Sequence, residues 1–373
     1  MHTVVDLFAG CGGGSMGFKK AGFKTLAAIE IDVDAAAAFA LNVGVKPIVK
    51  DIRDVSVTEL QAVGVQPGEL TLLFGCPPCQ SFTVLRRGSA ASDHDLRRNS
   101  LIFEYLRLVE ALQPRHIAFE NVPGLVGGRW SEYFEIFRER LDAMGYRIAW
   151  DVIDAADYGV PQRRRRVLVI GSRVTEPQLP EPTHGSKGDK KPYATVRQAI
   201  YGLPPLAPAE ADPHDPFHKA RRHSKLALRR LARIPEGGGR ADLPEDLVLN
   251  CHKNHNGHYD IYGRMWWDRV APTLTSGCTN VTRGRFAHPE QDRAITLREA
   301  MLLQTFPRKA HLHGTHDAMA LQVGNAVPSL LAERIATKIM GMERQSLPTS
   351  NELGKLEGHA DEPGEVRGVS PSD

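Results

Sequence analysis

The chain has 373 residues, 42% of them hydrophobic and 24% charged, enough for one large α/β domain with a smaller appendage or for two compact domains. Its apolar runs are far shorter than the roughly 20 residues of a membrane helix. No charged leader with a cleavage site precedes the first strand, so we expect a soluble cytoplasmic protein with no membrane partner. The net charge is +3, but residues 343–373 hold seven acids and three bases, which leaves +7 on the rest and favours a polyanionic partner.

Short β-branched or apolar runs alternate with helical ones through residues 3–171, which predicts an α/β fold with a mostly parallel sheet covered by helices. Strands are expected at residues 4–8, 25–29, 70–74, 116–119 and 167–170. A helix capped by Asn99 should present apolar residues at helical spacing over 101–112, until Pro114 ends it.

The character of the chain changes at about residue 172, where Pro, Gly, His and Arg become frequent and periodicity weakens. Residues 172–290 are therefore expected to form a separate, irregular lobe. Amphipathic helices are predicted again at 296–304 and 329–340, so that residues 291–341 complete the first domain. The polar tail 342–373 is expected to be disordered.

A glycine-rich turn follows the first strand in VVDLFAGCGGGSMGF, and Glu30 ends the next strand. Gly10, Gly12 and Gly13 would let a ligand approach the backbone where a helix begins, and Glu30 could bind ribose hydroxyls. The turn alone leaves a dinucleotide, S-adenosylmethionine or no ligand open, because the spacing is not GxGxxG and no Walker lysine follows. Asp51 could accept a hydrogen bond from an adenine amino group or be a surface turn residue.

Cys79 follows a strand in the run LLFGCPPCQSFT, where two prolines stiffen the backbone before it. A thiolate held rigidly at a strand end suits nucleophilic attack. A redox CxxC pair would open a helix early, whereas here the helix is delayed beyond residue 88. A zinc site would need ligands such as those in CHKNHNGH at 251–258, which lacks a paired CxxC, so no metal is expected. Cys76 is interpreted as a small buried residue beneath the loop.

Two further motifs carry charged side chains next to strands of the same sheet. Glu120 ends the strand in AFENVPG, where burial would favour a protonated carboxyl able to donate to a ring nitrogen. Four arginines precede the strand in YGVPQRRRRVLVIG, and strand alternation predicts Arg164 and Arg166 on one face.

A basic stretch in the irregular lobe predicts a helix with an apolar stripe of Ala and Leu between residues 227 and 232. Phosphate contact is favoured over a merely solvated face. Its basic residues are Lys219, Arg221, Arg222, Lys225, Arg229, Arg230 and Arg233.

The runs DLFAGCGGGSMGF, GCPPCQSFT, AFENVPGL, VPQRRRR, RAITLREAMLLQTFP and QVGNAVP resemble, in order and spacing, the cytosine-5 DNA methyltransferases. The resemblance covers residue 1 to about residue 340. It implies a Rossmann-like S-adenosylmethionine-dependent methyltransferase fold, with 1–171 as the catalytic and cofactor-binding domain and 172–290 as the target-recognition region. It also implies double-stranded DNA as partner, in a bacterial, nucleoid-associated monomer that acts alone or beside a cognate restriction endonuclease without forming a complex with it.

The resemblance assigns roles to the catalytic residues. The Cys79 thiolate would attack carbon 6 of a flipped-out cytosine, and Glu120 would stabilise the charge that develops at N3. Arg166 would bind the cytosine O2, and Arg164 would steady the closed catalytic loop, residues 80–99, and its phosphates.

The same resemblance places S-adenosylmethionine, with S-adenosylhomocysteine as product, in a pocket of twelve residues. These are Phe8, Gly10, Gly12, Gly13, Glu30, Ile31, Asp51, Ile52, Pro77, Leu101, Asn325 and Val327. The rival interpretations are a tRNA cytosine-5 methyltransferase of the DNA-type branch, a zinc-stabilised DNA-binding module, and an amino-methylating DNA enzyme, which would need no thiol.

Overall fold

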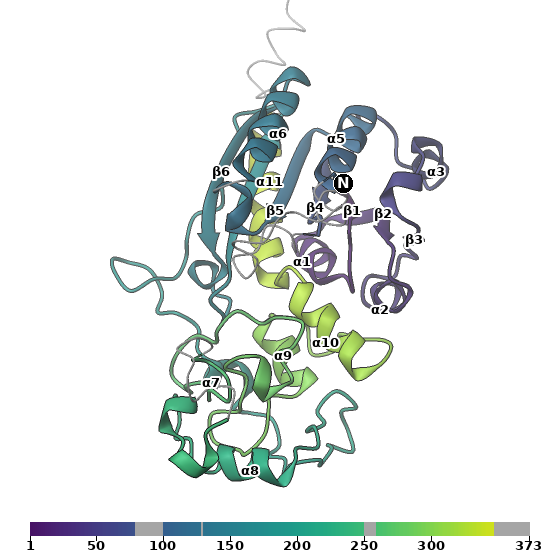
Figure 1. The fold of residues 1–373 in the computed structure, drawn as a ribbon. Coiled ribbons are helices and arrows are strands. Elements are labelled where there is room, and N and C mark those ends of the chain that lie inside the picture. The colour runs from purple at the N-terminus through teal and green to yellow at the C-terminus, as the bar shows by residue number, and fades with distance from the viewer. Residues whose placement is uncertain (79–99, 128–129, 250–258, 347–373) are drawn as a thin grey trace, which may run out of the picture.

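The computed structural model describes residues 1–78, 100–127, 130–249 and 259–346 (Figure 1). Cys79, the loop 80–99, the cluster at 251–258 and the tail from residue 347 lie outside the described residues. The roles predicted for them stay predictions.

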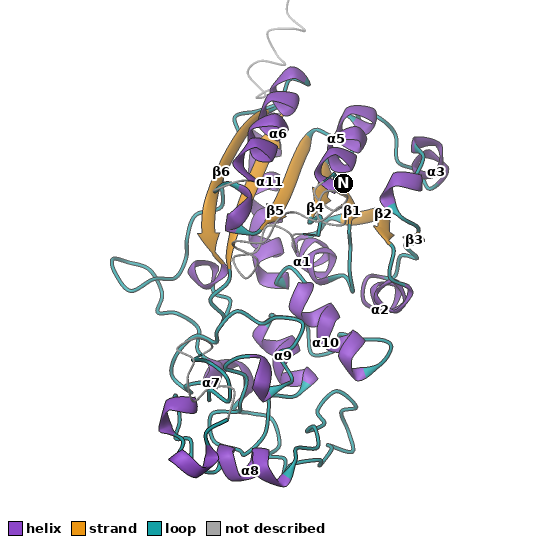
Figure 2. Ribbon diagram, viewed as in Figure 1, coloured by secondary structure: helices purple, strands orange, loops and turns teal. Residues whose placement is uncertain are grey.

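Within the described residues seven strands form one sheet, in the order β3-β2-β1-β4-β5-β7-β6 (Figure 2). They are β1 (Thr3–Leu7), β2 (Lys24–Glu30), β3 (Ile48–Val49), β4 (Leu72–Gly75), β5 (His116–Asn121), β6 (Arg147–Asp154) and β7 (Arg165–Ser172). β7 runs antiparallel to β5 and β6, and the other neighbouring pairs are parallel. The predicted α/β fold with a mostly parallel sheet is confirmed.

Two strands, β3 and β6, are absent from the five expected ones. β6, the longer of the two, lies at the sheet edge, and Ile153 is its one buried residue. Buried and exposed positions do not alternate along β6. The two-residue hydrophobic repeat that indicates a strand in a sequence is therefore weak there.

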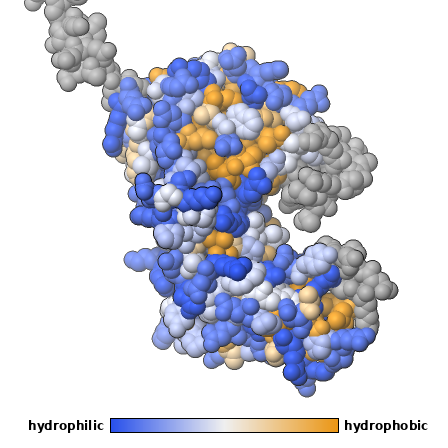
Figure 3. All heavy atoms as spheres, turned by 90° about the vertical axis from the view of Figure 1, so that its left-hand side faces the viewer, coloured by the Kyte–Doolittle hydropathy of each residue, from blue (hydrophilic) through white to orange (hydrophobic). Residues whose placement is uncertain are grey.

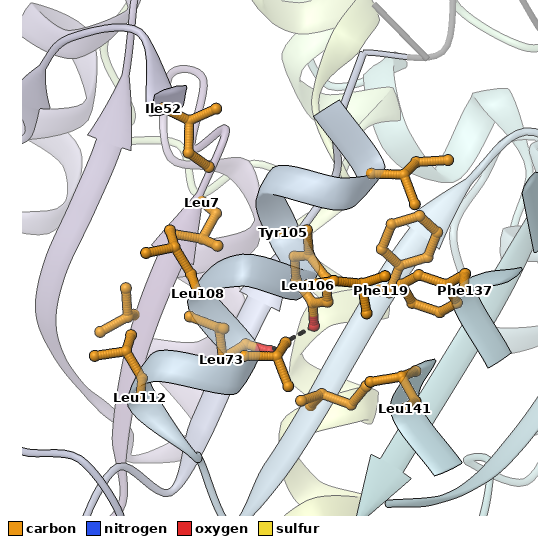
Figure 4. Close-up of a cluster of buried hydrophobic side chains, with 14 of the residues drawn as sticks. Leu7, Ile52, Leu73, Tyr105, Leu106, Leu108, Leu112, Phe119, Phe137 and Leu141 are labelled. Carbon is orange, nitrogen blue, oxygen red and sulfur yellow. Dashed lines mark hydrogen bonds between the residues drawn. The ribbon is translucent and has the colours of Figure 1, made fainter. Parts of the chain in front are cut away.

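Helices cover both faces of the sheet (Figure 1). On one face α5 (Leu101–Leu112) and α6 (Ser131–Ala143) pack on Leu73 and Phe119, as Figure 4 shows, with the Tyr105 hydroxyl donating to the Leu73 carbonyl at 3.2 Å. On the other face α1 (Gly13–Ala21) and α11 (Ser329–Ser346) pack on Leu72 and Phe74. This alternation along β4 sends odd-numbered residues to α5 and even-numbered ones to α11.

The last helix is longer than the sequence predicted. Its residue Met342 is buried in the core, and the Glu343 carboxylate accepts hydrogen bonds from Arg115 at 2.8 Å and from the His116 ring at 2.6 Å. Residues 342–346 thus belong to α11 rather than to the disordered tail expected from residue 342. Their polar sequence concealed contacts with β5 that are distant along the chain.

Smaller helices complete the molecule. They are α2 (Val33–Val43), α3 (Val57–Ala62), α7 (Val196–Ile200), α8 (Lys225–Leu231), α9 (Leu297–Leu303) and α10 (His316–Asn325). After β7, the described residues of the lobe predicted at 172–290 contain α7, α8, short 3-10 turns and isolated bridges in place of a sheet. In the space-filling view the outline is hollowed between this lobe and the sheet domain (Figure 3). None of the helices in the described ranges is long and apolar enough to span a membrane.

The predicted basic helix is shorter than expected. α8 starts at Lys225 after its N-cap Ser224, so Lys219, Arg221 and Arg222 precede it. Of the predicted apolar stripe, Ala227 and Leu231 are buried within α8. Seven residues give less than two full turns, and most of the basic side chains lie on irregular backbone.

Candidate active site

The carboxyl ends of β4 and β5 bring Cys76 beside Glu120. These strands pair in parallel with Gly75 opposite Phe119, so the next residue of each lies at the same level of the sheet. The Cys76 thiol donates to Glu120 Oε2 at 2.7 Å, and the Glu120 side chain is 2% exposed. Cys76 is half-buried and packs against the cluster that includes Phe74, and its thiol in addition has a hydrogen-bond partner that the sequence interpretation did not predict.

Arg166 completes this cluster from β7. Its Nε lies 3.0 Å from Glu120 Oε1, and its side chain is 13% exposed. The antiparallel register pairs Glu120 with Leu168, which places Arg166 diagonally across from Glu120 on the same face. The structure thus brings together two residues that the sequence indicated separately.

Arg164 precedes the first residue of β7, so the strand pairing that positions Arg166 does not extend to it. Its buried guanidinium donates to the carbonyls of Leu274 at 3.3 Å and Gly324 at 3.1 Å. Arg164 therefore ties the start of β7 to the lobe and to α10. The shared face of Arg164 and Arg166 stays a prediction.

The backbone that leads to Cys79 is held from β5. Asn121 Nδ2 donates to the carbonyl oxygen of Pro77 at 3.3 Å, and both residues are buried. Cys79 itself lies outside the described residues. The hydrogen bond from Asn121 therefore holds the backbone at Pro77, two residues before Cys79.

The glycine turn after β1 is tightly wound. Phe8, Gly10 and Gly12 have φ angles of 60°, 55° and 92°, in the left-handed region that glycine adopts without strain. The Gly10 amide donates to Glu30 Oε2 at 2.7 Å, and Glu30 Oε1 accepts from the Asp32 amide at 2.8 Å. Burial raises the pKa of Glu30, and the backbone donors oppose that shift.

Gly13 serves packing rather than ligand access. A side chain there would bring its Cβ within 2.6 Å of the Val327 carbonyl oxygen, and the Gly13 carbonyl accepts from the Ser329 hydroxyl at 2.8 Å. Gly10, in contrast, has open space where its Cβ would lie. The turn therefore needs glycine for two different physical reasons.

The remaining predicted cofactor residues surround the ends of β2 and β3. Ile31 is an exposed apolar side chain next to Glu30, while Ile52 is buried and its carbonyl accepts from Arg107 at 2.8 Å. Asp51 is paired with Arg53, whose hydrogen bonds lower the pKa of the Asp51 carboxyl. Leu101 and Phe8 are half-buried, Asn325 is exposed and Val327 is buried.

These residues fit a nucleoside. The partly exposed Glu30 carboxylate keeps acceptor capacity beyond its two backbone donors, as ribose hydroxyls would require. Ile31 offers an uncovered apolar surface for a base, and the open side of Gly10 leaves room near the backbone.

Two buried polar residues escaped the sequence interpretation. Asp6 in β1 accepts from the Ser15 hydroxyl at 2.6 Å, and burial raises its pKa to about 7 although Ser15 opposes the shift. Gln162 donates to Gln304 Oε1 at 3.0 Å and accepts from the Leu274 amide at 3.0 Å. Gln162 could have been noticed from its place in VPQRRRR, directly before the arginines that were interpreted as functional.

Among the described residues no group of three or more His, Cys, Asp or Glu is placed to hold a metal ion. The strongest sequence candidate for a zinc site, at 251–258, lies outside those ranges.

The sheet order, the antiparallel β7 and the site at the strands' carboxyl ends define an α/β fold of the methyltransferase class. A crystal structure from Escherichia coli described as a prophage-encoded DNA modification methyltransferase superposes with a TM-score of 0.68 at 24% identity, covering 92% of this chain and all of that one. A Spodoptera frugiperda DNMT2 structure matches with a TM-score of 0.56 at 16% identity, over 91% of this chain and all of that one. At these identities the likeness concerns the fold alone.

Sequence comparison identifies the family. The model of the C-5 cytosine-specific DNA methylases matches residues 2–341. Type II methylase M.HgiDII of Herpetosiphon aurantiacus is 37% identical over 343 residues, 90% of this chain and 94% of the relative. Type II methyltransferase M1.HphI of Haemophilus parahaemolyticus is 33% identical over 343 residues, 91% of this chain and 87% of the relative. The chain belongs to the C-5 cytosine-specific DNA methylase family and is an enzyme, as the sequence resemblance implied.

Proposed function

We propose that this enzyme transfers a methyl group from S-adenosylmethionine to carbon 5 of cytosine in a specific double-stranded DNA sequence. The observation that carries the proposal is the Glu120–Arg166 pair, whose Oε1 and Nε atoms are 3.0 Å apart. Glu120 lies on β5, beside the strand that leads to Cys79, and Arg166 lies on β7, the next strand of the sheet. Cytosine N3 and O2 are neighbouring atoms of one ring edge. A carboxyl and a guanidinium this close can bind both at once.

The reaction begins with the poor nucleophilicity of carbon 5. The Cys79 thiolate attacks carbon 6, forming a carbon–sulfur bond and pushing electron density toward N3 and O2. Glu120 donates to N3 and Arg166 to O2, so that the negative charge meets preorganised partners. Once carbon 5 carried the methyl group, loss of its proton to a base would expel the thiolate from carbon 6 and restore the aromatic ring.

When bound, S-adenosylmethionine supplies an electrophilic methyl group on its sulfonium for the activated carbon 5. Glu30 and Ile31 would hold the ribose, Asp51 and Ile52 the adenine, and Phe8, Gly10 and Gly12 the turn around the methionine part. Gly13, Pro77, Leu101, Asn325 and Val327 would complete the wall of the pocket. The hydrogen bond from the Gly10 amide to Glu30 supports this assignment, because it holds the carboxylate that would accept from the ribose hydroxyls beside the glycine turn.

The target base must leave the duplex, at a cost of a few kcal/mol, before Cys79 can reach carbon 6. We assign the choice of sequence to the lobe of residues 172–290, and we place Arg164 at its junction with the catalytic domain. Its bonds to the Leu274 and Gly324 carbonyls support that place, from which it would steady the catalytic loop. The names of the type II relatives favour a modification enzyme that works, as a monomer, beside a restriction endonuclease.

DNA that contains 5-fluorocytosine tests this mechanism directly. Fluorine at carbon 5 cannot leave as a proton would, so the enzyme should remain covalently attached, and mass spectrometry should locate the adduct on Cys79. Methylation without an adduct, or an adduct on another residue, contradicts the proposal. Activity on bulk tRNA but none on duplex DNA would overturn the substrate, and bisulfite sequencing of DNA from expressing cells would read the recognition sequence.

A further inference from the structure

We propose that Cys76 is a positioning residue that holds the Glu120 carboxyl in its reactive orientation. The inference rests on the proposed function, because it presumes that Glu120 acts on the cytosine ring. It concerns a thiol that the covalent mechanism does not use.

The position of Cys76 follows from the sheet. Gly75 opposes Phe119, and both of those residues face α5, where a Cβ on Gly75 would lie within 2.6 Å of the Tyr105 ring. Alternation turns the next residue of each strand to the opposite face, so Cys76 and Glu120 point to the same side. Cys76 packs there against the cluster that includes Phe74.

Two different groups contact the two oxygens of the Glu120 carboxylate. The Cys76 thiol donates to Oε2 at 2.7 Å, and Arg166 Nε forms an ion pair with Oε1 at 3.0 Å without a hydrogen bond to it. A carboxylate held at one oxygen can rotate about its last torsion, since that torsion is broad. Contacts on both oxygens from separate strands fix the plane of the group, and with it the direction in which Glu120 meets a ring nitrogen.

The experiment compares Cys76→Ala with Cys76→Ser in the full-length enzyme on duplex DNA. Alanine removes the donor, and serine keeps a hydroxyl donor at nearly the same size. We expect the alanine variant to lose about 10-fold in kcat, with little change in KM for S-adenosylmethionine, because the lost donor acts on the reacting carboxyl and not on cofactor binding. The serine variant should recover most of the kcat.

A double-mutant cycle with Glu120→Gln separates positioning through Glu120 from any independent effect. The Cys76→Ala change should lower kcat further by less than about 2-fold in the Glu120→Gln background, because contacting residues are not additive. Full multiplicativity, or equal kcat in wild type and Cys76→Ala, overturns the inference.

Adduct formation with 5-fluorocytosine DNA is measured on the same proteins. Wild type and Cys76→Ala should both give the adduct on Cys79, the variant more slowly. If wild type gives no adduct, the proposed mechanism fails. If the adduct forms at equal rates in both, the mechanism stands and the role of Cys76 fails.

Discussion

The sheet domain and the lobe are stabilised in different ways. The sheet places its functional side chains by strand register, with apolar side chains packed against both faces. The lobe has short helices and isolated bridges, and buried arginines satisfy its backbone carbonyls. Arg264, 3% exposed, donates to the carbonyls of Leu231, Ile234, His288 and Gln291 and pairs with Asp292.

This difference matters for function. A register error in a sheet is costly because it exchanges buried and exposed faces, so the distance between Glu120 and Arg166 is strongly determined. The described part of the lobe has only a small apolar cluster of its own and relies on single polar side chains in addition, so its surface loops can change at less cost. The contrast suits the proposed division between a catalytic centre in the sheet domain and a DNA-reading surface on the lobe.

The largest expected effect is on catalysis. Glu120→Gln should lower kcat by about 100- to 1000-fold, because a neutral amide provides neither the proton nor the charge complement for N3. Steady-state methylation of duplex DNA measures it. Glu333→Gln is the control, since Glu333 forms a surface pair with Lys20 at 2.9 Å. If kcat falls less than 10-fold in Glu120→Gln, the residues that strand register brings together are not the catalytic centre.

Arg264→Met should destabilise the lobe by about 3–5 kcal/mol, because it leaves buried carbonyls without their donor. Hydrogen exchange should rise in the lobe while the sheet strands stay protected. Arg138→Met is the control, since exposed Arg138 pairs with Glu135 one helical turn away. Equal loss of protection in both regions would contradict their separate stabilisation.

The two regions should also respond differently to pH. Asp6 in the sheet has a pKa raised by burial to about 7. Its favourable contribution to the free energy of unfolding is therefore present below pH 4 and is lost as the pH rises toward 7. Burial alone would raise the pKa of Glu299, but its pair with Arg293 lowers this pKa to about 2. The contribution of Glu299 to the free energy of unfolding is therefore lost only as the pH falls below 4.5.

Asp6→Asn should therefore gain stability relative to wild type between pH 5 and pH 8, by roughly 1–2 kcal/mol. Thermal unfolding across that range measures the difference. A constant offset between the two proteins at every pH would show that Asp6 does not change its charge there.

The smallest expected effect is on DNA affinity. Arg222→Ala removes an exposed cation of the lobe and should weaken binding by about 2- to 5-fold, with the salt slope reduced by roughly one. Arg230→Ala is the contrasting variant, because Arg230 donates to the Leu247 carbonyl at 2.8 Å and to the Tyr262 hydroxyl. It should lower the unfolding temperature instead. If both variants change only the salt dependence of DNA affinity, Arg222 and Arg230 do not differ in the way proposed.

Much of the sheet was predictable from the sequence. The five expected strands correspond to β1, β2, β4, β5 and β7, because apolar runs and glycine turns are local signals. The seven-residue α8 was predicted too long, because a run of basic residues indicates charge and does not determine where a helix ends.

The sequence by itself determined the family, the glycine turn and the types of side chain at the strand ends. Only the tertiary structure decided which of them meet. Cys76 and Glu120 are 44 residues apart and touch because β4 and β5 pair in parallel. Arg166 joins them through an antiparallel strand, while Arg164 is directed to the lobe. The reason is physical: local patterns set the period of a strand, whereas its neighbours and register depend on how the whole sheet packs.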